Sequence, residues 1–180
     1  NCIDNSNFFL TECRGLKALR SVHKIGVPKI LGMGIDREKG YSFLALEYIE
    51  SRHRINSYWE TFGHELAQMH KAQCLNFVSQ SGAEKDEEAG DSRYGFMEDN
   101  YIGAGPQKNT PMKSWGDFYR ECRLMPQFER AQSYLDPDAR KKADQLLGHL
   151  DLYLREPELP SLLHGDLWGG NMLCGPDGKA

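Results

Sequence analysis

The residues of this sequence best suited to chemistry stand in a polar stretch near its end, between two short apolar runs. This stretch contains His164, Asp166 and Asn171. In phosphoryl transfer a carboxylate orients the attacking hydroxyl and accepts its proton, and an amide oxygen a few residues later helps to hold the magnesium that neutralises the phosphates. Asp166 and Asn171 have the side chains and the spacing for these two roles. The alternative is that His164 and Asp166 belong to an ordinary loop between two strands.

The form His-x-Asp-x-x-x-x-Asn is that of the kinase catalytic loop. Because Gly165 follows the histidine, the loop resembles the branch that includes aminoglycoside phosphotransferases and choline kinases. We call residues 164–171 the 164–171 loop. Two short apolar runs bracket this loop.

A helix near the start of the chain carries a second candidate. Phe9, Cys13, Leu16 and Leu19 form one apolar face, and Glu12 falls on the same side of the helix. A carboxylate on an apolar face requires a cation as a partner, and none of the eleven residues before Glu12 is Lys or Arg. We therefore expect its partner to lie elsewhere.

After this helix the pattern becomes that of a sheet and then that of helices. Residues 26–34 predict an edge strand, 36–40 a charged turn, and 41–49 a mostly buried strand. An amphipathic helix is expected from Tyr58 to about Cys74.

The second half of the chain is predicted to be mainly helical. Residues 79–91 have the composition of a solvated loop, to which no function is assigned, and residues 93–110 that of an ordered loop. Residues 115–131 predict a helix with a break near Pro126, and Asp136 is expected to cap the next helix.

The narrower resemblance is to fructosamine kinases, whose catalytic loop reads His-Gly-Asp-Leu-Trp-x-Gly-Asn, as residues 164–171 do here. Further matches follow in the family's order: Asn100-Tyr101-Ile102-Gly103, Pro106-Gln107, Asn109, Trp115, Phe118, Arg123-Leu124 and Gln127. The resemblance covers nearly all of the chain. It implies an α+β, protein-kinase-like fold of two incomplete lobes, with residues 1–50 in the small lobe and 51–180 in the mainly helical large lobe.

The resemblance also implies roles in catalysis and nucleotide binding. Asp166 would be the catalytic base, Asn171 a ligand of Mg²⁺, and Glu12 the partner of the lysine that grips the phosphates of ATP. The main chain of Glu47-Tyr48-Ile49 would form the hinge that binds adenine. His164 would support the loop, the alternative being a proton shuttle.

Four residues are candidates for substrate binding. Trp168 could offer a flat face to a sugar, or it could pack into a core. Asn100, Gln107 and Asn109 could form a sugar wall, or they could fold their own loop.

In the family, ATP phosphorylates the 3-hydroxyl of a ketosamine formed from a sugar and a protein lysine, which leads to repair by deglycation. The resemblance thus implies ATP and Mg²⁺ as cofactors, and ribulosamine- or fructosamine-modified proteins or small ketosamines as partners. The alternatives are a kinase of the aminoglycoside or choline type and a non-catalytic fragment. The lysine strand expected before Glu12 and the second metal-binding aspartate expected after Asn171 are missing, since Asp177 is a turn residue. We therefore expect the chain alone to be inactive.

Composition restricts the other partners. The net charge of −4 and pI of about 5.9 do not favour nucleic acid, and the apolar stretches fall short of the roughly 20 residues that span a membrane. The five cysteines are scattered without metal-binding spacing, which predicts a reducing compartment. We expect a cytoplasmic location, with an organelle as the alternative because the N-terminus is expected to be missing.

Overall fold

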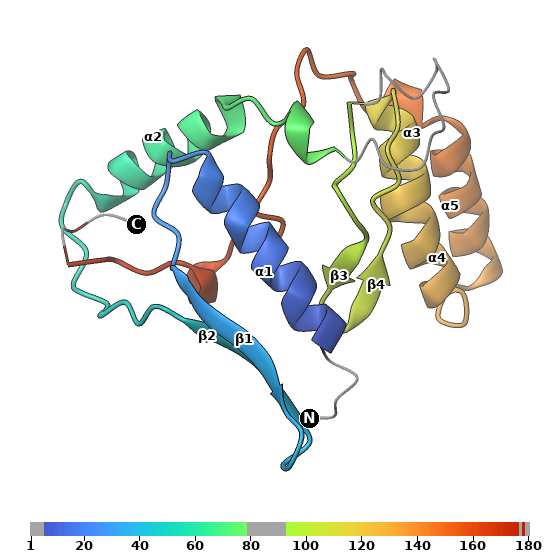
Figure 1. Ribbon diagram of the computed structural model, residues 1–180. Coiled ribbons are helices and arrows are strands. Elements are labelled where there is room, and N and C mark those ends of the chain that lie inside the picture. The colour runs from blue at the N-terminus through green and yellow to red at the C-terminus, as the bar shows by residue number, and fades with distance from the viewer. Residues whose placement is uncertain (1–5, 79–92, 177, 179–180) are drawn as a thin grey trace. The chain divides into compact units, whose positions relative to one another are not determined.

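The computed structural model describes residues 6–78, 93–176 and 178, so the predicted loop at 79–91 lies outside the described residues. The chain divides into two compact units, the first made of Asn1–Cys74 with Ser161–Ala180 and the second of Leu75–Pro160. Both units combine helices with a small antiparallel sheet, in agreement with the mixed helix and sheet expected (Figure 1). The bounds of these two units differ from the predicted division into lobes at residue 50.

The first unit begins with helix α1 (Ser6–Ser21) and a hairpin of β1 (Ile30–Asp36) and β2 (Tyr41–Leu46). The charged turn predicted at 36–40 is confirmed. The Oδ1 of Asp36 accepts hydrogen bonds from the amides of the second and third residues after it, both at 3.1 Å. Gly40 closes the turn with φ of 70°, a conformation that favours glycine.

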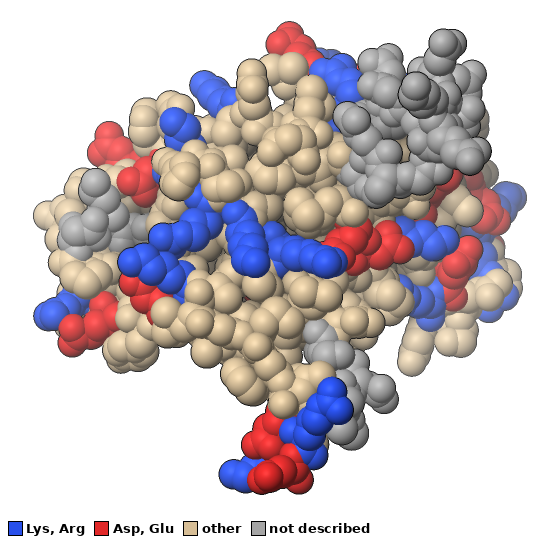
Figure 2. Space-filling view, in the orientation of Figure 1, with Lys and Arg blue, Asp and Glu red and all other residues tan. Residues whose placement is uncertain are grey.

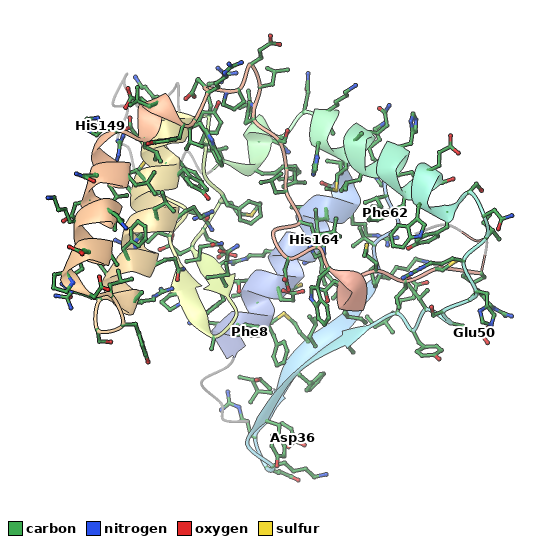
Figure 3. The ribbon with its side chains drawn as sticks, turned by 180° about the vertical axis from the view of Figure 1, so that it is seen from behind. Phe8, Asp36, Glu50, Phe62, His149 and His164 are labelled. Atoms are coloured by element: carbon green, nitrogen blue, oxygen red, sulfur yellow. The ribbon has the colours of Figure 1, made fainter. Side chains whose placement is uncertain are left out.

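The prediction of a mostly buried strand at 41–49 is wrong. Strand β2 ends at Leu46, and the side chains of Tyr41 and Phe43 are about half exposed. A sheet of two strands with α1 packed against it cannot cover both of its faces within this unit. Figure 2 shows charged side chains gathered at the free end of the hairpin, the end that carries Asp36 in Figure 3.

Helix α2 (Tyr58–Lys71) confirms the helix predicted from Tyr58, although it ends three residues earlier than expected. Ala72 adopts an extended conformation and stops it. On α2, Tyr58 and Phe62 are buried against Cys174 near the end of the chain. The hydroxyl of Tyr58 donates to the carbonyl of Leu173 at 3.1 Å, so α2 anchors the segment that follows the 164–171 loop.

The second unit contains the short turn η2 (Leu75–Phe77), a small hairpin and several helices. The hairpin pairs β3 (Asn100–Ile102) with β4 (Gly105–Gln107). The helical elements are α3 (Trp115–Tyr119), the π-helical turn η4 (Arg120–Leu124), α4 (Met125–Ala131), α5 (Pro137–Gly148) and η5 (Leu150–Leu152). The core joins Tyr94, Phe118 and Cys122, with Met112 and Trp115 packed against them.

Proline explains the interruption between α3 and α4. Pro126 has no amide hydrogen to donate to the carbonyl of Cys122, and the chain widens into the π-helical turn just before it, where the amide of Met125 bonds to the carbonyl of Arg120. The predicted break is therefore confirmed, but it lies mainly ahead of the proline. The cap predicted at Asp136 is also confirmed, because its Oδ1 accepts from the amide of Ala139 at 2.7 Å.

Candidate active site

The 164–171 loop belongs to the first unit, and buried residues hold it on both sides. Before the loop, Leu162 is buried and its backbone is hydrogen-bonded to Cys74. Burial raises the pKa of the Cys74 thiol, and this hydrogen bond opposes the rise. After the loop, Cys174 is buried and its carbonyl accepts from the amide of Arg52 at 2.7 Å. The polar loop therefore lies between two segments of chain that are held in place by buried residues and hydrogen bonds.

Within the loop, one amide group ties the two candidate catalytic side chains together. The Nδ2 of Asn171 donates to the carbonyl oxygen of Asp166 at 2.8 Å and to its Oδ2 at 3.0 Å. These bonds engage the Nδ2 of Asn171, while the Oδ1 atoms of both residues have no hydrogen-bond partner among the described residues. The spacing of five residues works because the loop turns back on itself through the 3₁₀ turn η6 (Gly169–Asn171).

The start of the loop explains why glycine follows the histidine. Gly165 has φ of 85°, in the left-handed region, and this reverses the chain between His164 and Asp166. The Nδ1 of His164 accepts from the amide of Asp166 at 3.3 Å. This bond favours the supporting role of His164, since it engages the ring nitrogen with the backbone of the candidate base. Figure 3 shows His164 on the loop just before η6.

Asp166, Asn171 and Trp168 are exposed. The Trp168 side chain is 62% exposed, so the alternative in which it packs into a core finds no support among the described residues. An exposed carboxylate with one free oxygen can accept a proton from the hydroxyl group of an acceptor.

Glu12 differs from its expected position. Its side chain is exposed, whereas Cys13, Ala18 and Leu19 are the buried residues of α1, so the prediction that Glu12 lies inward is wrong for this chain. The described residues offer it no ion pair, and a charged carboxylate stays solvated where no cation compensates its burial.

The expected hinge is only partly free to bind a ligand. The amide of Glu47 donates to the carbonyl of Lys29 at 2.8 Å, and its Oε2 accepts from the amide of Lys29 at 3.0 Å. This pair extends the hairpin beyond β2. Tyr48 is 87% exposed, and the main chain of Tyr48 and Ile49 makes no hydrogen bond within the described parts of the chain.

The three candidate sugar-wall residues lie together in the second unit, where they hydrogen-bond to one another. The Oδ1 of Asn100 accepts from Gln107 at 2.9 Å and from Asn109 at 3.0 Å. Asn109 is only 3% exposed, and its Nδ2 also donates to the carbonyl of Glu98. These bonds favour the alternative in which the amides fold their own loop. Only the Nδ2 of Asn100 and the Oε1 of Gln107 are left without a partner among the described residues.

Arg123 completes this network, although sequence reasoning gave it no role beyond the family pattern. Its Nη2 donates to the Oδ1 of Asn109 at 2.7 Å, its Nη1 donates to the carbonyl of Lys108, and its guanidinium lies 4.6 Å from the ring centre of Phe118. Burial lowers the pKa of the Arg123 guanidinium. The only signal in the sequence is that Arg123 follows Phe118 by five residues. The π-helical turn at Arg120–Leu124 brings residues with this spacing onto the same side of the helix.

The oxygen atoms of the loop suit a hard divalent cation. The free Oδ1 atoms of Asn171 and Asp166 are ligands of the kind that Mg²⁺ prefers, so the loop fits a partial magnesium site. No cluster of three or more His, Cys, Asp or Glu suited to a metal occurs among the residues that the structure describes.

No described helix has the length and apolar character needed to cross a membrane. Four cysteines, Cys13, Cys74, Cys122 and Cys174, are buried free thiols.

Comparison with known proteins decides the family. The sequence profile of the fructosamine kinases matches residues 1–180. The chain belongs to the fructosamine kinase family. It is similar to "Probable ketoamine kinase" of Synechocystis (35% identity, 91% of this chain and 49% of the relative). It is also similar to the chloroplastic protein-ribulosamine 3-kinase of Oryza sativa subsp. indica (34% identity, 96% of this chain and 46% of the relative).

A solved structure supports the same assignment for the fold of this fructosamine kinase chain. The crystal structure of a Thermobifida fusca protein assigned to the fructosamine-3-kinases matches with a TM-score of 0.74 and 32% identity, covering 99% of this chain and 54% of the other. The chain thus spans about half the length of the relatives it matches. These relatives are named as a ketoamine kinase and a protein-ribulosamine 3-kinase.

Proposed function

We propose that the protein of which this chain forms part transfers the γ-phosphoryl group of ATP to the 3-hydroxyl of a ketosamine, with protein-bound ribulosamine or fructosamine as substrate. The observation that carries this proposal is the Asp166–Asn171 pair, in which one amide fixes both the backbone and the carboxylate of Asp166. The family and the names of the relatives supply the substrate class.

Asp166 acts on the acceptor. Its free Oδ1 orients the sugar hydroxyl and takes its proton as the oxygen bonds to the γ-phosphorus and the bond to the bridging β,γ-oxygen breaks, releasing ADP. Asn171 keeps the Asp166 carboxylate in place through Nδ2 and would hold Mg²⁺ through Oδ1. When bound, the cation neutralises phosphate charge.

Nucleotide binding is proposed for three further positions. The unbonded main chain of Tyr48 and Ile49 supports contact with adenine, whereas the amide of Glu47 is already engaged by Lys29. Exposed Glu12 would become buried only when a lysine from outside the described residues pairs with it. We also propose that the complete protein has two kinase-like lobes divided near residue 50.

Substrate contacts are proposed for Trp168 and for the open amide atoms of Asn100 and Gln107. The exposed indole can pack on the C–H face of a sugar. Asn109 would act indirectly, by holding Asn100.

The buried free thiols support a reducing compartment such as the cytoplasm.

The decisive experiment uses a protein extended at both ends to the length of its relatives. Asp166→Ala should abolish phosphorylation of a ribulosamine-modified peptide while ATP binding persists, and Asn171→Ala should weaken binding of magnesium-ATP. Asp144→Ala, at an exposed position of α5, is the matched control and should keep full turnover. Near-normal turnover by the Asp166 variant would show that another group is the base. Activity on choline or an aminoglycoside, without activity on ketosamines, would show that the protein belongs to another class of kinase.

A further inference from the structure

Gly170 lies directly beneath the indole of Trp168. A Cβ added at Gly170 would stand 2.5 Å from Cη2, 2.6 Å from Cζ2 and 2.9 Å from Cζ3 of that ring. Carbon atoms in favourable contact are about 3.5–4.0 Å apart, so no side chain fits at this position while the ring stays where it is. The benzene portion of the indole therefore occupies the place that a side chain at Gly170 would take.

Backbone conformation does not explain this glycine. The described glycines with positive φ are Gly40, Gly95, Gly103, Gly165 and Gly178, and Gly170 is not one of them. Its neighbour Gly169 occupies the same turn and has open space where a Cβ would stand. The Trp168 ring thus occupies the space that a side chain at position 170 would need.

The same turn connects the indole to the candidate catalytic groups. The amide of Asn171 donates to the carbonyl of Trp168 at 2.8 Å, and the side chain of Asn171 donates to Asp166. The Cζ2, Cη2 and Cζ3 atoms of the indole lie close against Gly170, yet the residue remains 62% exposed. A large apolar ring that is fixed on one side and open on the other is a preformed binding surface.

We propose that Gly170 is a positioning residue for the sugar acceptor. By admitting the Trp168 ring against the turn, it sets the height and tilt of the open indole face, on which the sugar ring of the ketosamine packs with its hydroxyl toward Asp166. The inference rests on the proposed function for the identity of the sugar, whereas the hold of Gly170 on the indole is independent of it. Gly170 acts through Trp168 and touches no reacting atom.

The position of the ring can be tested in the 180-residue chain by ¹⁹F NMR with 5-fluorotryptophan. The sequence has three tryptophans, so three resonances are expected, and Trp168→Phe identifies that of Trp168. Gly170→Ala should shift this resonance alone, because the new methyl displaces the ring. Gly169→Ala, which meets open space, should leave it in place. An unshifted Trp168 resonance in the Gly170 variant would overturn the proposal.

Kinetics in the extended protein test the role in substrate binding. Gly170→Ala and Trp168→Ala should each raise KM for a ribulosamine peptide about threefold to tenfold, with KM for ATP unchanged. In the double variant the methyl has room, so its KM should equal that of Trp168→Ala. Gly63→Ala, an open position within α2, is the control for KM.

The outcomes separate the two proposals. If the KM effects of the two substitutions multiply, Gly170 does not act through the indole and the inference is wrong. If the extended protein phosphorylates no ketosamine, the proposed function fails, while the NMR comparison still decides whether Gly170 positions the ring.

Discussion

Replacing Asn109 with alanine should destabilise the second unit far more than any other change in its hairpin region. The Asn109 side chain makes three hydrogen bonds: Nδ2 donates to the carbonyl of Glu98 and to Asn100, and Oδ1 accepts from Arg123. It is also the buried polar residue of the described core. Alanine removes all three bonds and leaves part-buried groups unpaired.

The expected loss in the free energy of unfolding follows from these bonds. Two neutral bonds contribute about 1 kcal/mol each and the bond to the charged guanidinium about 2 kcal/mol, which gives about 4 kcal/mol. Arg123 keeps its bond to the carbonyl of Lys108, which limits the loss. Gln107→Ala removes a single bond, to Asn100, and should cost about 1 kcal/mol.

Urea unfolding monitored by tryptophan fluorescence measures these losses. Trp115 reports on this unit because it packs against Phe118, the residue under the Arg123 guanidinium. Replacing the exposed Trp59 and Trp168 with phenylalanine leaves Trp115 as the only tryptophan. The matched control is Lys108→Ala, since Lys108 is exposed and contributes only its backbone carbonyl, and it should change stability by less than about 0.5 kcal/mol.

A loss for Asn109→Ala no larger than that for Gln107→Ala would refute this reasoning. It would mean that the three bonds do not act as a unit in the folded protein. A loss that grows when a ribulosamine peptide is added would instead indicate that Asn109 contacts substrate, because the substrate would then stabilise the unsubstituted protein more than the variant.

Three further predictions concern stability, pH and activity. Asp136→Ala removes the cap of α5 and should cost about 1 kcal/mol in urea unfolding, and a cost no greater than that of Asp144→Ala would contradict the role of the cap. Burial raises the pKa of the Cys74 and Cys122 thiols above the ordinary thiol value, so the folded state binds protons more tightly than the unfolded state. The stability that these thiols contribute should therefore be fully present below the ordinary thiol pKa and be lost as the pH rises through the folded values, and Cys122→Ala should lessen the fall in the thermal midpoint. The 180-residue chain alone should show no measurable turnover with ATP, Mg²⁺ and a ribulosamine peptide beside an extended protein, and comparable turnover by the two would show that the chain already contains every group needed.

Local signals in the sequence determined several elements correctly. The turn at Asp36, the start of α2 at Tyr58 and the cap at Asp136 each depend on interactions between residues a few positions apart, which the sequence displays directly. The hydrogen bond between Asp166 and Asn171 is local too, but the sequence predicted only the roles of these residues, and those roles stay a prediction. The family follows from this loop together with the ordered matches along the chain.

Tertiary structure alone decided the roles that depend on burial and on partners distant in sequence. Periodicity placed Glu12 on an apolar face, but the exposure of that face depends on what packs against it. The amides of Asn100 and Asn109 could equally have served a sugar or their own loop, and the hydrogen bonds through Arg123 favour the loop. The family pattern has a glycine at position 170, but only the folded loop shows that the Trp168 ring occupies the space beside it, because a steric contact is not visible as a periodicity in the sequence.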